Sequence, residues 1–163
     1  QDIVAERGGI AVQSKTGHAF IKQTMRTERA VYGGEMSAHH YFRDFAYCDS
    51  GMVPWLLIVE LISKSGNSLG NLIQDRFEKF PSSGEINFTV ADAQASIVRV
   101  SEAYKSQALS VDETDGLSFD CGDWRFNLRK SNTEPLVRLN LEARGNAGAL
   151  EQRIAKLSAL IIG

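Results

Sequence analysis

The chain has 163 residues, with 18 basic and 20 acidic side chains and a formal net charge of -2. Hydrophobic residues make up 43% of it and charged residues 23%, which is typical of a folded globular protein and excludes intrinsic disorder as its main state. The length suits one domain or two small ones. No basic excess is available to neutralise phosphates, so we expect no binding to nucleic acid.

Membrane insertion and secretion are not indicated. The longest apolar stretch, residues 52–62, is too short to span a bilayer, and no cationic leader with an apolar core opens the chain. The two cysteines, Cys48 and Cys121, form neither a CxxC pair nor a zinc-type spacing with the three histidines. Two scattered thiols suit a reducing compartment, so we expect a cytoplasmic protein. The chain starts at Gln1 rather than Met, and we expect a fragment of a longer protein.

The first third of the chain has the pattern of an α/β unit. A short apolar run at residues 10–12 predicts a strand, and the polar loop 14–18 then opens a helix with Ile21 and Met25 on its apolar side. Residues 30–32 predict a second strand. This strand–loop–helix–strand order predicts one right-handed crossover of a parallel sheet.

Two helices follow an irregular aromatic-rich stretch. Ser50 can cap the first, which is apolar nearly all round over residues 55–62 and is therefore expected to be deeply buried, with Trp55 in the core. Ser68 can cap the second, which has a clean apolar face. Trp124, further along the chain, fits an apolar stripe and is expected in the core as well.

The best domain boundary is the Phe-Pro-Ser-Ser-Gly segment at residues 80–84, after which the pattern changes. Asp92 can cap a helix, and a final helix runs through residues 150–161. Alternating apolar residues predict five short strands, at residues 86–90, 109–111, 117–119, 124–128 and 137–141.

These elements define the predicted fold class and domains. We expect residues 1–80 to be an α/β fragment, which is part of a three-layer αβα domain. We expect residues 81–163 to form a small α+β domain with a mostly antiparallel sheet, because several strands are flanked by one helix on each side of the run.

One polar loop lies between the last two predicted strands and has the residues of an anion nest. It contains Arg129, Ser131, Asn132 and Thr133, with Arg138 just beyond. A guanidinium, two hydroxyls, an amide and free backbone N–H groups in one loop can bind an oxyanion such as phosphate. The alternative is a plain turn flanked by solvated arginines.

A second polar loop, residues 33–40, contains Glu35, Ser37, His39 and His40 between glycines and aromatic residues. A carboxylate beside hydroxyl and imidazole groups can hold the hydroxyls of a carbohydrate. A metal site from Glu35, His39 and His40 is a weaker alternative, because adjacent histidines point in different directions in most backbones. A polar loop without a ligand is the third reading.

His18, in a Thr-Gly-His sequence at the predicted helix start, is a candidate acid or base because imidazole titrates near neutral pH. A lone histidine is more often structural, and that reading stays open. No set of nucleophile, histidine and aspartate stands out, and neither a GxGxxG nor a Walker loop is present.

Together these segments resemble the C-terminal part of the bacterial phosphomannomutases in the α-D-phosphohexomutase family. The resemblance runs essentially from end to end, with the motifs in family order. The matching segments are Ser14–His18, Gly34–His39, Asp49–Gly51 and Arg129–Pro135 followed by Arg138.

The resemblance implies roles for the residues of the first unit. Glu35 and Ser37 would hold hydroxyls of the hexose, and His39 would lie beside them near the substrate. His18 would lie close to the reacting centre, as the candidate for proton transfer. The family usually has Gly where this chain has Ala38, and we expect the one added methyl to be tolerated.

The resemblance also implies that Arg129, Ser131, Asn132 and Thr133, together with Arg138, bind the phosphate that is not transferred. In the family, the other phosphate is transferred by a phosphorylated serine in a Ser-His-Asn-Pro loop. An Asp-x-Asp-x-Asp-Arg loop holds Mg2+. Neither motif occurs in this chain.

The expected function and partners follow from the resemblance. Family members have four domains, and this chain would supply the later part of the third and all of the fourth. The full enzyme would interconvert mannose 6-phosphate and mannose 1-phosphate, with Mg2+ and a hexose 1,6-bisphosphate activator. The expected partners are the phosphosugar and the remaining N-terminal domains, and the isolated chain is expected to be inactive. The alternative is a stand-alone, non-catalytic phosphosugar-binding or interaction module.

Overall fold

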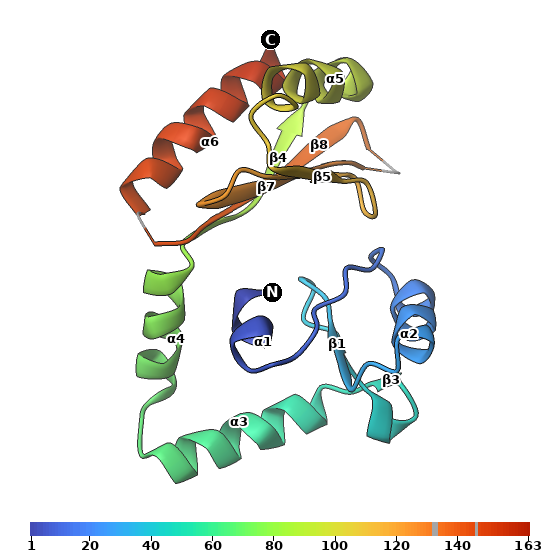
Figure 1. Ribbon diagram of the computed structural model, residues 1–163, viewed down its shortest axis with the longest axis vertical. Helices are drawn as coiled ribbons and strands as arrows, with labels where there is room; N and C mark the ends of the chain where they lie inside the picture. Colours follow the sequence, from blue (N-terminus) through green and yellow to red (C-terminus); the bar gives the residue numbers. More distant parts are fainter. Residues whose placement is uncertain (132–133, 146) are drawn as a thin grey trace. The chain divides into compact units, whose positions relative to one another are not determined.

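The computed structural model describes residues 1–131, 134–145 and 147–163, and the chain divides into two compact units, Gln1–Asn67 and Ser68–Gly163 (Figure 1). The elements of the first unit are α1 (Asp2–Glu6), α2 (His18–Thr27), β1 (Tyr32–Gly34), β2 (His40–Phe42), the 3-10 turn Arg43–Phe45, β3 (Cys48–Asp49) and α3 (Met52–Ser65).

A small antiparallel sheet, in the order β1-β2-β3, organises the first unit. Tyr41 is the central residue of β2 and pairs with Gly33 on one side and Asp49 on the other. The buried core consists of Tyr41 with Ile21 and Met25 from α2. Gly33 permits this packing, because a Cβ there would lie 2.8 Å from the Met25 sulfur.

The parallel crossover predicted for this unit is wrong for the described residues. No strand forms at residues 10–12, where Ile10 is 90% exposed, and the strand predicted at residues 30–32 begins only at Tyr32. Its partner β2 runs antiparallel to it. A strand requires a hydrogen-bonded neighbour, and the described residues offer none to 10–12, so that run does not become a strand.

The deep burial predicted for the helix at residues 55–62 is also wrong. None of the residues of α3 is buried, and Trp55 is 56% exposed rather than part of a core. An all-round apolar helix needs packing partners on every side, and the described part of this unit does not supply them. The local signals do hold: the Val53 N–H donates to the Ser50 hydroxyl over 3.3 Å, and the helix ends at left-handed Gly66.

The second unit contains a five-stranded sheet in the order β4-β8-β7-β6-β5, with every neighbouring pair antiparallel. This confirms the predicted mostly antiparallel sheet. Its elements are α4 (Leu69–Lys79), β4 (Ser82–Thr89), α5 (Ala93–Tyr104), β5 (Ser110–Asp112), β6 (Leu117–Asp120), β7 (Trp124–Lys130), β8 (Leu136–Ala143) and α6 (Ala147–Ile162).

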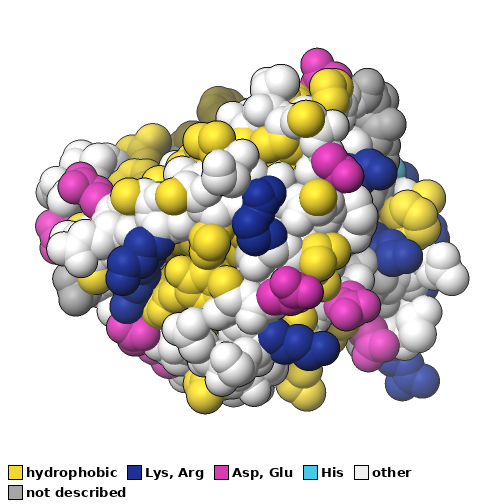
Figure 2. All heavy atoms as spheres, turned by 90° about the horizontal axis from the view of Figure 1, so that it is seen from above, with side chains coloured by type: hydrophobic (Ala, Val, Ile, Leu, Met, Phe, Trp, Pro, Cys, Tyr) yellow, Lys and Arg dark blue, Asp and Glu magenta, His cyan; other side chains and the backbone are white. Residues whose placement is uncertain are grey.

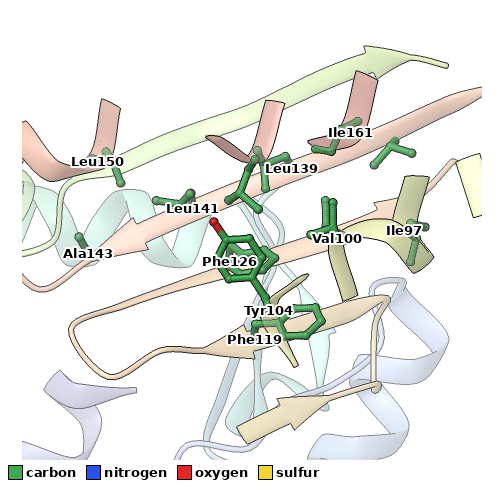
Figure 3. Close-up of a cluster of buried hydrophobic side chains, with 13 residues drawn as sticks. Ile97, Val100, Tyr104, Phe119, Phe126, Leu139, Leu141, Ala143, Leu150 and Ile161 are labelled. Atoms are coloured by element: carbon green, nitrogen blue, oxygen red, sulfur yellow. The ribbon is translucent and has the colours of Figure 1, made fainter. Parts of the chain in front are cut away.

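Helices α5 and α6 pack on one face of this sheet and enclose the main core (Figures 1 and 3). Phe119 and Phe126 stack with ring centroids 4.8 Å apart, and Trp124 packs against the same cluster as predicted. The buried Ser96 hydroxyl of α5 donates to the Ile161 carbonyl of α6 over 2.7 Å, which links the two helices. Asp92 caps α5 by accepting from the Ala95 N–H.

Helix α4 begins with the predicted Ser68 cap, whose hydroxyl accepts from the Asn71 N–H over 3.2 Å. By its packing, α4 belongs to the second compact unit. The assignment of residues 68–80 to the α/β fragment predicted over residues 1–80 remains a prediction.

On the face that Figure 2 shows, basic and acidic side chains are interspersed with hydrophobic ones, and neither charge gathers in one field. Within the ranges that the structure describes, no helix combines the length and the apolar character needed to cross a membrane.

Candidate active site

The turn between β1 and β2 positions the predicted sugar-binding residues. The Ala38 N–H donates to the Glu35 carbonyl over 3.1 Å, and the Glu35 N–H donates to the His39 carbonyl over 2.9 Å. Ala38 has a φ of 62°, in the left-handed region that favours glycine. This tight closure places the side chains of Glu35 and His39 at the two ends of one turn, with Ser37 exposed at its tip.

The Glu35 carboxylate is held by a hydrogen bond from Tyr41. The Tyr41 side chain is fully buried, and its hydroxyl donates to Glu35 Oε1. Burial, followed by the hydrogen bond to Glu35, raises the pKa of Tyr41 well above its usual range, so the phenol stays protonated as a donor. The Glu35 carboxylate is therefore held through its Oε1 atom.

His39 is held by Asp49. Its Nδ1 lies 2.7 Å from Asp49 Oδ2, while the other oxygen of Asp49, Oδ1, accepts from the His40 N–H over 3.0 Å. The hydrogen bond to His39, followed by that to His40, holds the pKa of Asp49 below its usual range. Asp49 is therefore a carboxylate at neutral pH.

His18 completes this cluster from the start of α2. Its ring centroid lies 4.6 Å from that of His39 and 5.5 Å from that of Tyr41. The expected divergence of the adjacent histidines is also present, because His40 turns to the Tyr32 hydroxyl, 2.7 Å from its Nδ1. The structure thus brings His18, Glu35 and His39 together, while His40 faces elsewhere.

The metal site considered from Glu35, His39 and His40 is not the group that the structure gathers. Among the described residues, the ligand atoms that converge belong to His18, His39 and Asp49, within 4.8 Å of one another. Two of these ligand atoms, His39 Nδ1 and Asp49 Oδ2, are already joined to each other by a hydrogen bond. Mg2+ prefers oxygen ligands, so a set with two imidazoles does not fit it.

Asp49 is the functional candidate for which sequence reasoning assigned no role. It stood within the Asp-Ser-Gly segment that carried part of the family resemblance. The available signal was spacing: an acidic residue about ten positions after His39 returns to it when the two strands pair antiparallel. The register of β2 with β3, in which Tyr41 pairs with Asp49, places the carboxylate at the start of β2.

The predicted phosphate-binding residues lie in the second unit, where β7 meets β8. Arg129 and Arg138 are directly opposite each other in the ladder, so their guanidinium groups share one face of the sheet. Glu85 of β4 lies 3.8 Å from Arg129 and 3.4 Å from Arg138, and Asp115 lies 3.3 Å from Arg129. The arginines are therefore partly buried and ion-paired rather than merely solvated.

Asp115 is positioned by a close approach of the β5–β6 turn to β7. A Cβ on Gly116 would lie 2.4 Å from the Leu128 carbonyl, and Gly116 has a φ of 74°. The Asn127 side chain also donates to the Asp115 carbonyl over 2.8 Å. Only glycine fits at position 116. The close approach places the Asp115 carboxylate within ion-pair distance of Arg129.

Ser131 is nearly buried, at 7% exposed, at the end of β7. Its N–H donates to the Leu136 carbonyl over 2.9 Å, and its hydroxyl accepts from the Glu134 N–H over 3.3 Å. These bonds connect Ser131 with Glu134 and with Leu136 at the start of β8. The predicted residues Asn132 and Thr133 lie outside the described residues.

Two family models match this chain in order. The model of the phosphoglucomutase/phosphomannomutase alpha/beta/alpha domain III matches residues 1–80, and that of the phosphoglucomutase/phosphomannomutase C-terminal domain matches residues 85–159. The chain belongs to the phosphoglucomutase/phosphomannomutase family. This confirms the family resemblance and the predicted fold class, an α/β fragment followed by a small α+β domain.

Similar curated proteins carry mutase names. The chain is 61% identical over 162 residues to a protein of Xanthomonas campestris named "Phosphohexose mutases". It is 60% identical over 159 residues to a phosphomannomutase of Salmonella typhimurium and 58% identical over 160 residues to one of Escherichia coli. These matches cover 98–99% of the chain, which spans about 35% of the length of these relatives.

A solved structure agrees with the fold. The crystal structure of a phosphoglucomutase/phosphomannomutase family protein from Burkholderia thailandensis matches with a TM-score of 0.75 and 26% identity. The match covers 97% of this chain and 33% of that one.

Proposed function

We propose that this chain is the C-terminal part of a phosphohexomutase that interconverts mannose 6-phosphate and mannose 1-phosphate. The observation that carries the proposal is the 58–60% identity, over 98% of the chain, to proteins named phosphomannomutase. The reaction would proceed through a phosphoserine and a hexose 1,6-bisphosphate, which also serves as activator. Two scattered thiols are compatible with action in the cytoplasm.

In this proposal, the turn between β1 and β2 recognises the sugar. The Glu35 carboxylate accepts hydrogen bonds from hexose hydroxyls, and the Ser37 hydroxyl lies exposed beside it. The support is geometric: the Tyr41 hydroxyl fixes one Glu35 oxygen and leaves the other free for the ligand. A carboxylate held in this way does not have to be ordered when the sugar binds, which favours binding.

Proton transfer at the reacting hydroxyl falls to the pair of His18 and His39. Their rings are in edge contact, and both lie in the same unit as Glu35. Imidazole exchanges protons near neutral pH, as the reaction requires. His18 was the sequence-based candidate, and the hydrogen bond from His39 to Asp49 adds His39 as a second one.

The loop after β7 binds the phosphate that is not being transferred. Arg129 and Arg138 present two guanidinium groups on one face, and Ser131, Asn132 and Thr133 add hydroxyl, amide and backbone donors. Glu85 and Asp115 hold the arginine side chains in place before a ligand arrives. Holding a remote phosphate orients the reacting end of the sugar.

The nucleophile and Mg2+ belong to parts of the enzyme other than these residues. The chain has neither a Ser-His-Asn-Pro nor an Asp-x-Asp-x-Asp-Arg motif, and its gathered ligand atoms do not suit Mg2+. When bound, Mg2+ would neutralise charge on the transferring phosphoryl group. The remaining N-terminal domains are thus the expected intramolecular partners.

The test is a graft of residues 1–163 into the Escherichia coli relative, in place of its matching segment. The isolated chain should show no conversion of mannose 1-phosphate to mannose 6-phosphate with Mg2+ and a hexose bisphosphate, whereas the graft should be active. Within the graft, Glu35→Ala or Arg129→Ala should lower kcat/KM about 10- to 100-fold, the value of a lost charged hydrogen bond of about 1.5–3 kcal/mol.

Arg125→Ala is the matched control, because Arg125 also lies on β7 but pairs with exposed Glu142 at the other end of the strand. It should leave kcat/KM within about twofold, as expected for a surface ion pair. An inactive but folded graft, or turnover by the isolated chain, would contradict the proposal. A stand-alone binding module is not favoured, because the relatives that match 98–99% of this chain are named as mutases.

A further inference from the structure

We propose that Asp49 is the positioning residue of His39: it fixes the neutral imidazole in the tautomer that carries its proton on Nδ1, and leaves Nε2 as the proton-accepting atom. The catalytic consequence of this inference rests on the proposed function. The positioning itself is a property of the first unit and can be measured by NMR in the grafted enzyme, whether or not the graft turns over substrate.

The hydrogen-bonding capacity of the two groups determines the direction of the bond. An ionised carboxylate can only accept, so the 2.7 Å contact between His39 Nδ1 and Asp49 Oδ2 requires a proton on Nδ1. The low pKa of Asp49 keeps that carboxylate ionised at neutral pH. A neutral imidazole has one N–H, and its other nitrogen, Nε2, is then unprotonated.

The carboxylate itself is fixed independently of His39. Asp49 Oδ1 accepts from the His40 N–H over 3.0 Å, and the ladder between β2 and β3 sets the position of the Asp49 backbone. The two Asp49 oxygens therefore accept separate hydrogen bonds, Oδ1 from the His40 backbone and Oδ2 from the His39 ring. A side chain anchored in this way can orient an imidazole without being ordered by it.

The other groups around His39 do not compete for Nδ1. His18 meets the ring edge to face, with centroids 4.6 Å apart, and Tyr41 gives its hydroxyl to Glu35. The neighbouring His40 is turned to Tyr32. Asp49 is thus the group that the described residues place on Nδ1 of His39.

The decisive variant is Asp49→Asn, which keeps the shape of the side chain. The amide oxygen should keep accepting from the His40 N–H, which turns the NH2 group toward His39. An NH2 group donates, so Nδ1 must then accept and the ring proton must move to Nε2. The same exchange of tautomer explains the loss of activity when the aspartate of a Ser-His-Asp triad becomes asparagine.

The measurement is long-range 1H–15N NMR of the 15N-histidine-labelled graft, after EDTA treatment, at about pH 8. Wild-type His39 should show a protonated Nδ1 and an unprotonated Nε2, and Asp49→Asn should reverse the two. Asp44→Asn is the control, since Asp44 is an exposed carboxylate of the same unit paired with Arg43. It should leave the spectrum unchanged.

A wild-type His39 with mixed tautomers, or an Asp49→Asn variant with the wild-type pattern, would overturn the inference. In the grafted enzyme, Asp49→Asn should lower kcat by about 100-fold or more, the usual share of positioned acid–base catalysis, with a much smaller change in KM. A KM effect alone would count against positioning. If the graft is inactive as a whole, the proposed function fails, and the NMR result still decides the role of Asp49.

Discussion

Single residues in the first unit show how neighbouring strands hold the polar side chains of a short turn. Glu35 and His39 flank the turn, and each receives one support from a neighbouring strand, Tyr41 from β2 and Asp49 from β3. The supports differ in kind, because Tyr41 donates and Asp49 accepts. In each of the two side chains, this support engages one polar atom, Oε1 of Glu35 and Nδ1 of His39.

The strained residue in this turn is Ala38, with a φ of 62°. We predict that Ala38→Gly stabilises the first unit by about 0.5–1 kcal/mol. The left-handed conformation costs an alanine about 1–2 kcal/mol, and the extra flexibility of an unfolded glycine takes back about 0.4–1 kcal/mol. Hydrogen exchange of the β1 and β2 amides should slow accordingly.

Ala19→Gly is the matched control for this prediction, because Ala19 is an exposed residue of helix α2. Glycine in a helix costs up to about 1 kcal/mol, so the same amides should exchange faster in this variant. If Ala38→Gly also speeds exchange, the strain at Ala38 does not outweigh the entropy of glycine.

Among the secondary-structure elements, the sequence predicted those whose signals are local. Alternation found the strands of the second unit, and Ser68 and Asp92 marked helix starts, because caps and period-two patterns depend only on neighbouring residues. The strand expected at residues 10–12 and the burial expected for α3 failed. Both need partners distant in the chain, which a local pattern does not reveal.

The same distinction applies to the candidate site. The resemblance identified His18, Glu35 and His39, and the structure gathers them. The roles of Tyr41 and Asp49 became visible only from the antiparallel register of β2 with its neighbours. The ion pairs of Arg129 likewise depend on strands distant in sequence, so the loop alone left an anion nest and a turn with solvated arginines as alternatives.

Helix α6 is joined to the sheet by an ion pair with a predictable pH dependence. Arg153 of α6 lies over the Trp124 ring at 4.8 Å and donates to Asp123 over 2.8 Å. That hydrogen bond holds the pKa of Asp123 below its usual range. Because the folded pKa is lowered, the contribution of this pair is complete above the unfolded pKa of about 3.9 and is lost as the pH falls further.

We therefore predict that Asp123→Asn lowers the free energy of unfolding slightly at pH 7 and that the difference from wild type shrinks as the pH falls below the unfolded pKa of about 3.9. Urea unfolding at several pH values measures it. Glu151→Gln, which changes an exposed carboxylate of α6, should follow the wild-type curve throughout. A difference between Asp123→Asn and wild type that persists unchanged at low pH would show that the ion pair is not its source.

At the scale of the whole chain, the two units differ in how much core they have. The second unit buries a continuous cluster that includes Leu139, Leu141 and Leu157 (Figure 3). The core of the first unit consists of three buried side chains, and α3 exposes large apolar residues. Buried apolar surface is the main driving force of folding, so the two parts should behave differently in isolation.

We predict that residues 81–163, expressed alone, fold cooperatively, whereas residues 1–80 do not. The first fragment keeps all strands of the five-stranded sheet with α5 and α6, and loses only α4, whose Leu69, Ile73 and Phe77 are exposed in any case. It should give a dispersed amide spectrum and a sigmoidal urea transition. Residues 1–80 should bind a hydrophobic dye and unfold gradually, because the apolar surface of α3 has no partner within that fragment. A cooperative transition in residues 1–80 would mean that α3 buries its apolar faces within the first unit, and a disordered 81–163 would mean that its core needs the rest of the chain.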